Sequence, residues 1–259
     1  MNVSMSIVTY NSADEIEGVL DSLAKSNLGG IDLKVYVVDN NSTDNTTAII
    51  KEKYPEVVLI ENEKNLGFGA AHNVAINMAD SEYHIIVNPD IVFLKNTLQD
   101  LASYVSENPD AVIVTPKILN NDEELSEQFL PKKNPKIKYL LGGIFENKSK
   151  ICKRWRREYT MQDRKNNEPC EIDFCTGCFM FCRTEALKKV GGFDERYFLH
   201  FEDADLTREM KKIGKTMFVP FVQVVHKWHR DNHGNKKILL IAFRSMMIYF
   251  KKWNLRLVK

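Results

Sequence analysis

Residues 1–117 alternate short runs rich in β-branched and aromatic residues with segments whose apolar residues recur at helical spacing. Within 13–26, for example, Ile16, Leu20 and Leu23 fall on one helical face. This alternation predicts an α/β fold, in which a mostly parallel sheet is flanked by helices. The expected strands are 3–9, 33–38, 57–60, 84–87 and 111–115, and the expected helices are 13–26, 43–53, 69–78 and 97–106.

The stretch 118–169 is rich in Lys, Asn, Pro and Gly, and its periodicity is weak. We interpret it as a long excursion with one helix rather than as a second domain. Regular structure is expected to resume with a strand over 171–183. Further expected elements are helices over 184–190 and 204–213, strands over 216–219 and 222–225, and a final helix over 236–253.

Composition limits the class of protein. With 259 residues, 44% of them apolar and 27% charged, the chain has the make-up of a globular protein. The longest apolar run, 238–243, is too short to cross a bilayer, and no basic region precedes an apolar run at the N-terminus, so we expect no membrane span and no secretory signal. Five cysteines, an odd number, favour the reducing cytosol over a secreted disulfide scaffold.

Charge is distributed unevenly along the chain. Residues 1–130 have a net charge of −14, whereas residues 131–165 have +9 and residues 226–259 have +8. The acidic first half excludes a general nucleic-acid binder. The two basic segments fit phospholipid headgroups or a pyrophosphate, or they are solvated faces that balance the acidic half.

Polar residues follow the first three expected strands, where an α/β sheet binds its ligands. Thr9, Tyr10 and Asn11 end the first strand, and Asp39 ends the second. A carboxylate at that position suits hydrogen bonding to a base or a ribose, while the nearby Ser42 or Thr43 alternatively caps the following helix. Asn65 and Gly67 precede the third helix, where glycine lets the backbone approach a ligand, or simply forms a tight turn.

The later strand ends carry groups for metal binding and proton transfer. In Asn88-Pro89-Asp90 the carboxylate suits a hard divalent cation on a diphosphate, although the same tripeptide also forms plain turns. Glu202 and Asp203 open a helix, where they serve either as N-terminal caps or as a general base in a partly dry pocket. The last strand ends at His226, followed by His229 and His233, and a neutral imidazole there can complete a metal site.

These motifs follow one another in an ordered series: SIVTYNS, VVDNNSTDNT, NLGFGAAHNVAI, NPD, CTGCFMFCR, GGFDERYFLHFEDADLTRE and VVHKWH. With this order and spacing, the chain resembles the family 2 glycosyltransferases of GT-A fold, and most closely their bacterial rhamnosyltransferase-like members. The resemblance implies a Rossmann-like GT-A domain over 1–235, in which 118–170 is a long insertion on the acceptor side, and a basic amphipathic helix over 236–259.

The resemblance also implies roles for individual residues. Residues implied in binding the donor nucleotide are Thr9, Tyr10, Asn11, Asp39, Asn65, Gly67 and Asn88. Asp90 matches the last acid of the family's D-x-D motif, which holds Mg²⁺ or Mn²⁺ on the donor diphosphate, and His226 matches a late histidine that joins the metal. Asn88 stands where the first acid is expected, which lowers the charge of the site. Asp203 matches the catalytic base, and Glu202 its neighbour, which shapes the acceptor site.

The reaction implied is an inverting single displacement, in which Asp203 takes a proton from the acceptor hydroxyl as that oxygen attacks the anomeric carbon. The implied donor is dTDP-L-rhamnose, with UDP-hexoses as the alternative. The implied acceptor is a glycan or a polyprenyl-pyrophosphate-linked sugar at the inner leaflet of the plasma membrane, in bacterial O-antigen or capsule synthesis.

Other functions fit the residues less well. A nucleotidyltransferase of the same fold usually carries a Gly-rich loop and a basic pair after the first strand, where this chain has Tyr10-Asn11-Ser12. An inactive sugar-nucleotide-binding module would not need Asp39, Asp90, Asp203 and His226 together. A dinucleotide-dependent oxidoreductase is disfavoured because no G-x-G-x-x-G follows the first strand.

Two further segments carry alternatives. Cys170, Cys175, Cys178 and Cys182 have spacing that is loosely similar to a metal site, but they lie in an apolar stretch, and we interpret them as core residues beside a Thr176-Gly177 turn near the acceptor. The segment 236–259 is rich in large apolar residues with basic margins. It is expected either to lie in the headgroup layer of a membrane, with 148–157 as a second contact, or to pack on the sheet.

Overall fold

Strands and helices alternate along the chain in the computed structural model, which describes residues 1–121, 127–129, 132–163, 167–227 and 236–253. The strands are β1 (Asn2–Thr9), β2 (Asp32–Asp39), β3 (Val58–Glu61), β4 (Tyr83–Val87), β5 (Ile91–Phe93), β6 (Ala111–Asn120), β7 (Glu127–Phe129), β8 (Cys170–Glu171), β9 (Phe179–Arg183) and β10 (Lys215–His226). The helices are α1 (Ile16–Ala24), α2 (Thr46–Lys53), α3 (Phe68–Met78), α4 (Thr97–Glu107), α5 (Ile137–Phe145), α6 (Lys150–Tyr159), α7 (Thr184–Val190), α8 (Glu202–Met210) and α9 (Lys236–Lys252).

The strands of the described residues form one sheet in the order β3-β2-β1-β4-β9-β6-β10-β5, with β7 paired to β6 and β8 to β10. β3, β2, β1 and β4 pair in parallel, as do β6 and β10. β9 runs antiparallel between β4 and β6, and β5 runs antiparallel to β10. The longer strands therefore point the same way, which confirms the expected mostly parallel sheet and brings their carboxyl ends to one edge.

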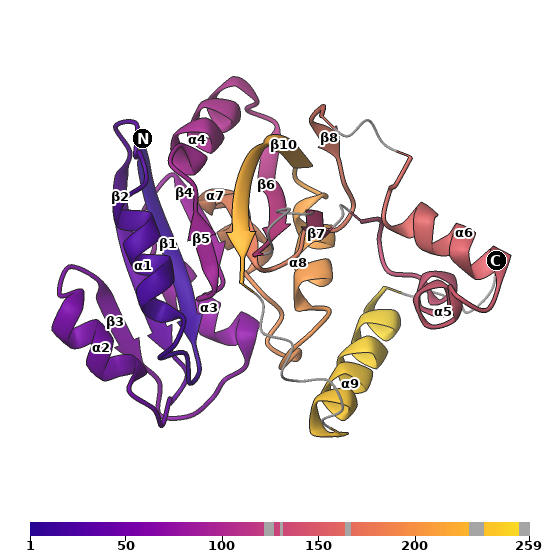
Figure 1. The fold of residues 1–259 in the computed structure, drawn as a ribbon, viewed down its shortest axis with the longest axis horizontal. Helices are drawn as coiled ribbons and strands as arrows, with labels where there is room; N and C mark the ends of the chain where they lie inside the picture. The colour runs from indigo at the N-terminus through magenta and orange to yellow at the C-terminus, as the bar shows by residue number, and fades with distance from the viewer. Residues whose placement is uncertain (122–126, 130–131, 164–166, 228–235, 254–259) are drawn as a thin grey trace.

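Helices cover both faces of this sheet (Figure 1). On one face α1 and α4 pack through the apolar positions that the sequence pattern predicts, including Ile16, Leu20 and Leu101. On the other face α3, α7 and α8 pack around residues such as Leu187 and Met210. Because both faces are covered, β1 is buried along its whole length after its first residue.

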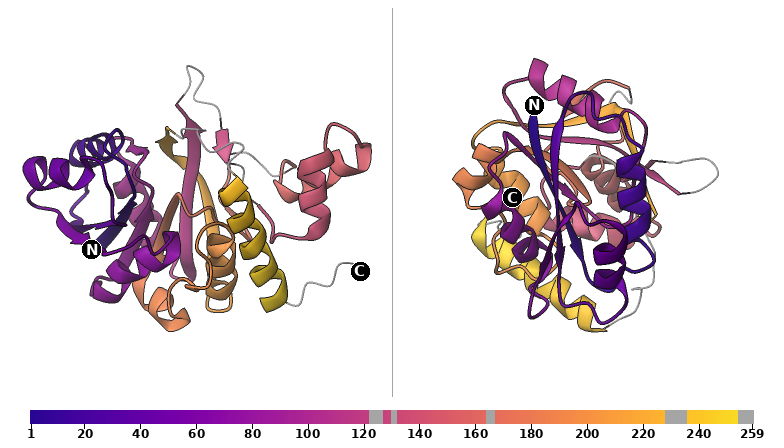
Figure 2. Two further views of the ribbon diagram at one scale, coloured as in Figure 1. Left: turned by 90° about the horizontal axis from the view of Figure 1, so that it is seen from below. Right: turned by 90° about the vertical axis from the view of Figure 1, so that its left-hand side faces the viewer.

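The structure corrects the expectation for 118–169. β6 continues to Asn120, and two helices follow instead of one, with the α5–α6 pair projecting from the end of the sheet farthest from β3 (Figures 1 and 2). The two helices pack on each other, with the rings of Tyr139 and Tyr159 stacked at a centroid distance of 5.1 Å. The weak periodicity expected of this stretch is wrong for α6, in which Ile151, Trp155 and Tyr159 recur at helical spacing between basic residues.

Three smaller expectations are also wrong. The predicted strand 171–183 is interrupted, because only its two ends pair with neighbouring strands, as β8 and β9. The strands predicted on either side of Pro220 are one strand, β10, whose pairing with β6 shifts register between Val219 and Gln223. α2 begins at Thr46, so neither Ser42 nor Thr43 caps it. In the described part of the chain, no helix combines the length and apolar character needed to cross a bilayer.

A chain of buried polar side chains runs beneath the sheet. Ser4 Oγ lies 2.7 Å from His84 Nδ1, and Ser6 Oγ lies 2.8 Å from His84 Nε2 and 2.7 Å from His72 Nδ1. Both imidazoles are fully buried. Burial lowers the pKa of His72 well below its usual range and lowers the pKa of His84 to about 3. Both rings are therefore neutral in the folded protein.

This arrangement makes stability depend on pH. In the unfolded chain both histidines take up protons below about pH 6.5, whereas the folded protein excludes them, so the stabilisation is complete above that pH and is lost as the pH falls. We expect the free energy of unfolding, measured by urea titration, to drop by roughly 2.7 kcal/mol per pH unit below about pH 5.5, which corresponds to two protons. In NMR titrations of the native protein, two imidazoles should not titrate above pH 5, and titration of all histidines near 6.5 would contradict this account.

Candidate active site

The ends of β1 and β2 are joined through Asp39. This buried carboxylate accepts hydrogen bonds from Thr9 Oγ1 at 2.8 Å and from the backbone N–H of Ser42 at 2.8 Å, and Ser42 Oγ also donates to it. Ser42, which the sequence suggested as a helix cap, thus holds the turn that follows β2. Three of the acceptor positions of Asp39 are occupied, and its remaining lone pair is available to a ligand.

The loops beside Asp39 differ in exposure. The Tyr10 side chain is 54% exposed at the edge of the sheet. Asn11 has a φ of 53° and accepts hydrogen bonds from the N–H and the hydroxyl of Thr43. Asn65 Oδ1 accepts the N–H of Gly67 at 2.9 Å, which closes the turn before α3. The aromatic face and the polar backbone of these loops form the surface that the sequence assigns to the nucleotide.

Gly67 is required for packing as well as for the turn. Its φ is 89°, and a Cβ at this position would lie 2.4 Å from the carbonyl oxygen of Phe198. The next residue, Phe68, donates its N–H to that same oxygen at 3.0 Å. The predicted glycine therefore lets the start of α3 approach the loop that leads into α8.

Asn88, Asp90 and His226 come together through strand register. β5 follows Asp90 directly and pairs antiparallel with β10, so that Ile91 lies opposite His226. His226 Nε2 is 3.1 Å from Asp90 Oδ1 and 3.4 Å from Asn88 Nδ2. The Asp90 and His226 side chains are only 15% and 3% exposed. Their spacing in the sequence did not show that these residues are close. The pairing of β10 with β5 brings His226 next to Asp90. His229 and His233 lie outside the described residues.

Glu202 and Asp203 open α8 after a strained turn. His200 and Phe201 have φ values of 69° and 68°, a conformation that costs non-glycine residues free energy and that clusters at functional sites. Asp203 Oδ2 accepts the N–H of Gly177 at 3.1 Å, and Asp203 Oδ1 accepts the N–H of Ala204 at 2.8 Å. The Thr176-Gly177 turn predicted near the acceptor thus contacts the predicted base directly.

The two adjacent acids have different surroundings. Burial raises the pKa of Glu202 well above its usual range, and the charge of Asp203 raises it further. Glu202 Oε2 is buried and has no hydrogen-bond partner among the described residues. Burial also raises the pKa of Asp203, but the Gly177 N–H and the charge of Lys132 oppose that rise. Of the pair, Glu202 is therefore the group more strongly held in its neutral form.

A cavity of about 500 Å³, which we call the central cavity, brings the two groups of predicted residues together. Its wall includes Glu202, Asp203, Asn88 and His226. Asp90 does not line the cavity but contacts His226, which does. The predicted residues of the first two strand ends, with Asn65 and Gly67, lie along the sheet edge outside this cavity.

Sequence reasoning missed several residues of this wall, among them Lys132 and Tyr159. Lys132 Nζ lies 5.0 Å from the centroid of the Phe174 ring. Burial lowers the pKa of the Lys132 ammonium, while the charge of Asp203 raises it. Both residues come from the excursion 118–169, where no periodicity or motif marked them.

Three of the four cysteines in 170–182 are packed in the core as expected. Cys175, Cys178 and Cys182 are buried, and burial raises the pKa of each thiol, whereas Cys170 is only partly buried. Among the described residues, no three side chains of the metal-binding types are grouped as a site for a metal ion.

Comparison with known proteins identifies the family. The sequence matches the profile of "Glycosyl transferase family 2" over residues 4–191. The chain belongs to this family. The match ends before Glu202, so α8, β10 and α9 lie beyond the matched region of this glycosyltransferase.

Relatives of the glycosyltransferase extend over most of its length. It is 29% identical over 257 residues to the N-acetylglucosaminyl-diphospho-decaprenol L-rhamnosyltransferase of Mycobacterium tuberculosis, covering 93% of this chain and 81% of that one. It is 27% identical over 250 residues to the rhamnosyltransferase WbbL of Escherichia coli, covering 92% of this chain and 87% of that one.

Solved structures confirm the GT-A fold. TarS of S. aureus superposes with a TM-score of 0.66 at 21% identity, covering 100% of this chain and 41% of TarS. The mannosyltransferase PcManGT of Pyrobaculum calidifontis, in complex with GDP-Man and Mn²⁺, superposes with a TM-score of 0.63 at 19% identity, covering 97% of this chain and 64% of that one.

Proposed function

We propose that this glycosyltransferase moves L-rhamnose from dTDP-rhamnose to a hydroxyl of a lipid-linked glycan in the synthesis of a bacterial surface polysaccharide. The observation that carries the proposal is the central cavity, whose wall combines Asp203 with the Asn88–His226 pair. The printed names of the two full-length relatives support rhamnose as the transferred sugar.

In the proposed reaction, the acceptor hydroxyl lies in the central cavity beside Asp203. The acceptor oxygen forms a bond to the anomeric carbon, its proton passes to the Asp203 carboxylate, and the bond between that carbon and the phosphate oxygen breaks. The nucleoside diphosphate leaves with the electron pair, from the opposite face of the sugar, so that the configuration is inverted. The N–H groups of Gly177 and Ala204 hold the base in one orientation.

Two matched substitutions test the assignment of the base. Asp203→Asn removes the proton acceptor and should lower kcat roughly 10²–10⁴-fold, with the KM for the donor unchanged. Glu202→Gln replaces a protonated carboxyl with a group of the same shape and should retain most of the wild-type kcat. Because the base must be ionised and its pKa is raised, wild-type activity should fall as the pH falls through that raised pKa. Near-wild-type turnover by Asp203→Asn would refute the assignment.

The residues at the end of β4 fit a divalent cation, which we propose to be Mg²⁺ or Mn²⁺. Asp90 Oδ1 is buried and has no hydrogen-bond partner among the described residues, although His226 Nε2 is 3.1 Å away. A buried carboxylate oxygen of this kind is the ligand type that both cations prefer, and the imidazole nitrogen beside it suits Mn²⁺ better than Mg²⁺. Asp90 and His226 would hold the ion, and when bound it would neutralise charge on the donor diphosphate.

Thermal shift measurements test both the donor and the metal. With Mn²⁺ present, dTDP-rhamnose should raise the Tm more than UDP-hexoses do, because a ligand at about 100 times its Kd stabilises the fold by about 2.7 kcal/mol. EDTA should remove most of this rise. Asp90→Asn should reduce this rise in Tm. Asp32→Asn, the same change at the exposed first residue of β2, should not. A larger rise with a UDP-hexose would overturn the donor assignment, and a full rise in EDTA would overturn the metal.

We further propose that α9 contacts the inner face of the plasma membrane. Leu239, Leu240, Phe243 and Met247 are between 54% and 72% exposed. At its other end the helix is anchored, because Lys252 Nζ and Trp253 Nε1 each lie 2.7 Å from the carboxylate of Asp205 in α8. An apolar stripe on a basic, anchored helix suits the headgroup layer of a bilayer.

Vesicle flotation tests this membrane contact without removing the anchor. Leu239→Ser combined with Phe243→Ser should reduce flotation with vesicles that contain anionic phosphatidylglycerol at least fivefold, since each change removes apolar area from the interface. Phe221→Ser is the matched control, because Phe221 is 57% exposed on β10, as Phe243 is on α9. Unchanged flotation of the double variant would exclude the contact.

A further inference from the structure

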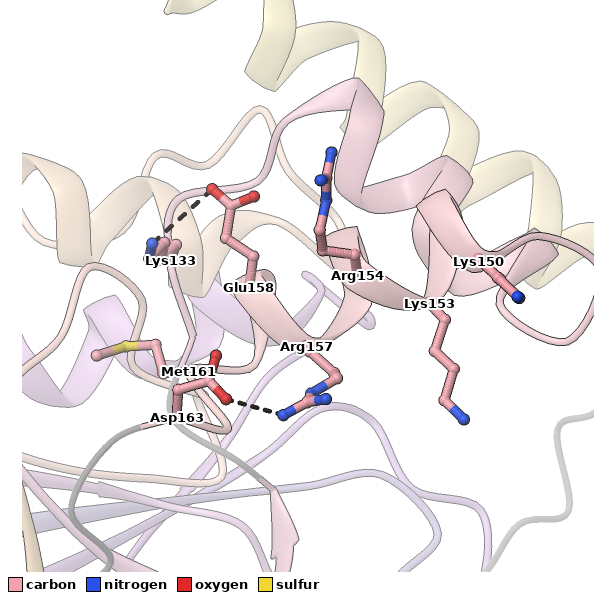
Figure 3. A pocket seen from close by; sticks show the side chains of 8 residues that line it. All are labelled: Lys133, Lys150, Lys153, Arg154, Arg157, Glu158, Met161 and Asp163. Carbon is pink, nitrogen blue, oxygen red and sulfur yellow. Dashed lines mark hydrogen bonds and ion pairs between the residues drawn. The ribbon is translucent and has the colours of Figure 1, made fainter.

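An open cleft of about 700 Å³ lies along α6. We call it the basic cleft, and Figure 3 shows the residues that line it: Lys133, Lys150, Lys153, Arg154, Arg157, Glu158, Met161 and Asp163. Five of these eight side chains are cations and two are acids, so the cleft has an excess of positive charge.

The two acids of the basic cleft are already paired. Glu158 forms an ion pair with Lys138 at 3.0 Å, and Asp163 forms one with Arg157 at 2.9 Å. Lys150, Lys153 and Arg154 have no carboxylate within ion-pairing distance among the described residues, and Figure 3 shows them extending from α6 toward solvent. Three unpaired cations therefore remain along the cleft.

The spacing of the cations on α6 is unfavourable for the helix itself. Lys150, Lys153, Arg154 and Arg157 occupy positions i, i+3, i+4 and i+7, so that like charges are neighbours on one face. Lys150 and Lys153 also fall in the first turn, where the helix dipole disfavours positive charge. The isolated fold gains nothing from this arrangement, whereas a bound anion would relieve both repulsions.

The basic cleft and the central cavity lie on two sides of one thin wall. Lys132 lines the central cavity while its neighbour Lys133 lines the basic cleft, and likewise Tyr159 lines the cavity while Glu158 lines the cleft. The N–H of Lys133 donates to the carbonyl of Tyr159 at 2.9 Å and joins the two strips of chain. The cleft and the cavity are therefore neighbours, separated by these two backbone segments.

Charge on α6 also acts across this wall. The guanidinium of Arg156 contributes to lowering the pKa of Lys132, after burial, and it opposes the rise that burial causes in the pKa of Tyr159. The central cavity thus lies in the positive field of α6, as suits an acceptor whose sugar is attached directly to an anion.

We propose that the basic cleft binds the diphosphate of a prenyl-diphosphate-linked acceptor while its sugar occupies the central cavity. The proposal rests on the lipid-linked acceptor of the proposed function and assigns its anionic group to Lys150, Lys153 and Arg154. Arginine binds phosphate oxygens through a forked pair of donors and lysine binds them as a point charge, and three cations match the two to three negative charges of a diphosphate.

Direct binding tests the site without requiring transfer. Isothermal titration in neutral detergent measures the affinity for farnesyl diphosphate, with farnesol as the uncharged analogue. The wild type should bind the diphosphate and not farnesol. The triple variant Lys150→Gln, Lys153→Gln and Arg154→Gln should bind it at least tenfold more weakly. The control triple Lys25→Gln, Lys95→Gln and Lys189→Gln, which removes the same charge from exposed sites elsewhere, should bind as the wild type does.

Transfer assays add a specificity ratio. The triple variant should lower kcat/KM for a sugar on a prenyl diphosphate at least tenfold relative to kcat/KM for the same sugar on an uncharged alkyl chain, with the control triple at the wild-type ratio.

Equal binding of farnesyl diphosphate by the wild type and the triple variant overturns the proposal. Loss of binding to anionic vesicles alone, with unchanged binding of the diphosphate in detergent, also overturns it and assigns the cleft to phospholipid headgroups. Binding as expected, without any transfer of rhamnose, would refute the proposed function and leave the diphosphate site standing.

Discussion

The position of Glu202 and Asp203 depends on the contacts that α3 makes with the loop before α8. The Asn73 side chain pairs with both backbone groups of Phe193, each at 2.8 Å, and Phe68 donates its N–H to Phe198 at 3.0 Å. Gly67 makes the second contact possible, because any side chain there would collide with the Phe198 carbonyl. These contacts hold the strained residues before Glu202. The helix that follows the Gly67 turn, α3, therefore also fixes the start of α8.

The electrostatics of the central cavity follow from this fixed geometry. Two adjacent carboxyl groups at one helix N-terminus cannot both ionise cheaply in a partly dry space. The available donors favour one of them, since Asp203 receives two N–H groups and faces Lys132, while Glu202 Oε2 receives none. The fold therefore gives two chemically similar side chains different surroundings, which hold Glu202 more strongly in its neutral form than Asp203.

Sequence patterns predicted the features that depend on neighbouring residues in the chain. They missed the features that depend on contacts between distant segments. The strand ends were located correctly because a change from an apolar run to Asp39 or Asp90 marks the edge of a buried sheet. The start of α8 was also marked, because an apolar run meets two acids there. The pairing of His226 with Asp90 needed the β5–β10 register, which no local pattern encodes. Lys132 lies in a polar segment without periodicity, and only the folded α5–α6 pair carries it into the cavity.

The parts of the wall that were hardest to predict are those that face the acceptor. Leu140 of α5 and Ala242 of α9 both line the central cavity, although each belongs to a helix with exposed apolar residues on its outer side. An acceptor anchored in a bilayer would then meet the enzyme where two partly exposed helices border the catalytic cavity. Because α5 and α9 make few contacts with the sheet, packing constrains their residues only weakly. Their sequences can therefore be suited to the acceptor without disturbing the fold. The strand ends proposed to hold the nucleotide have no such freedom, because each one also completes the core.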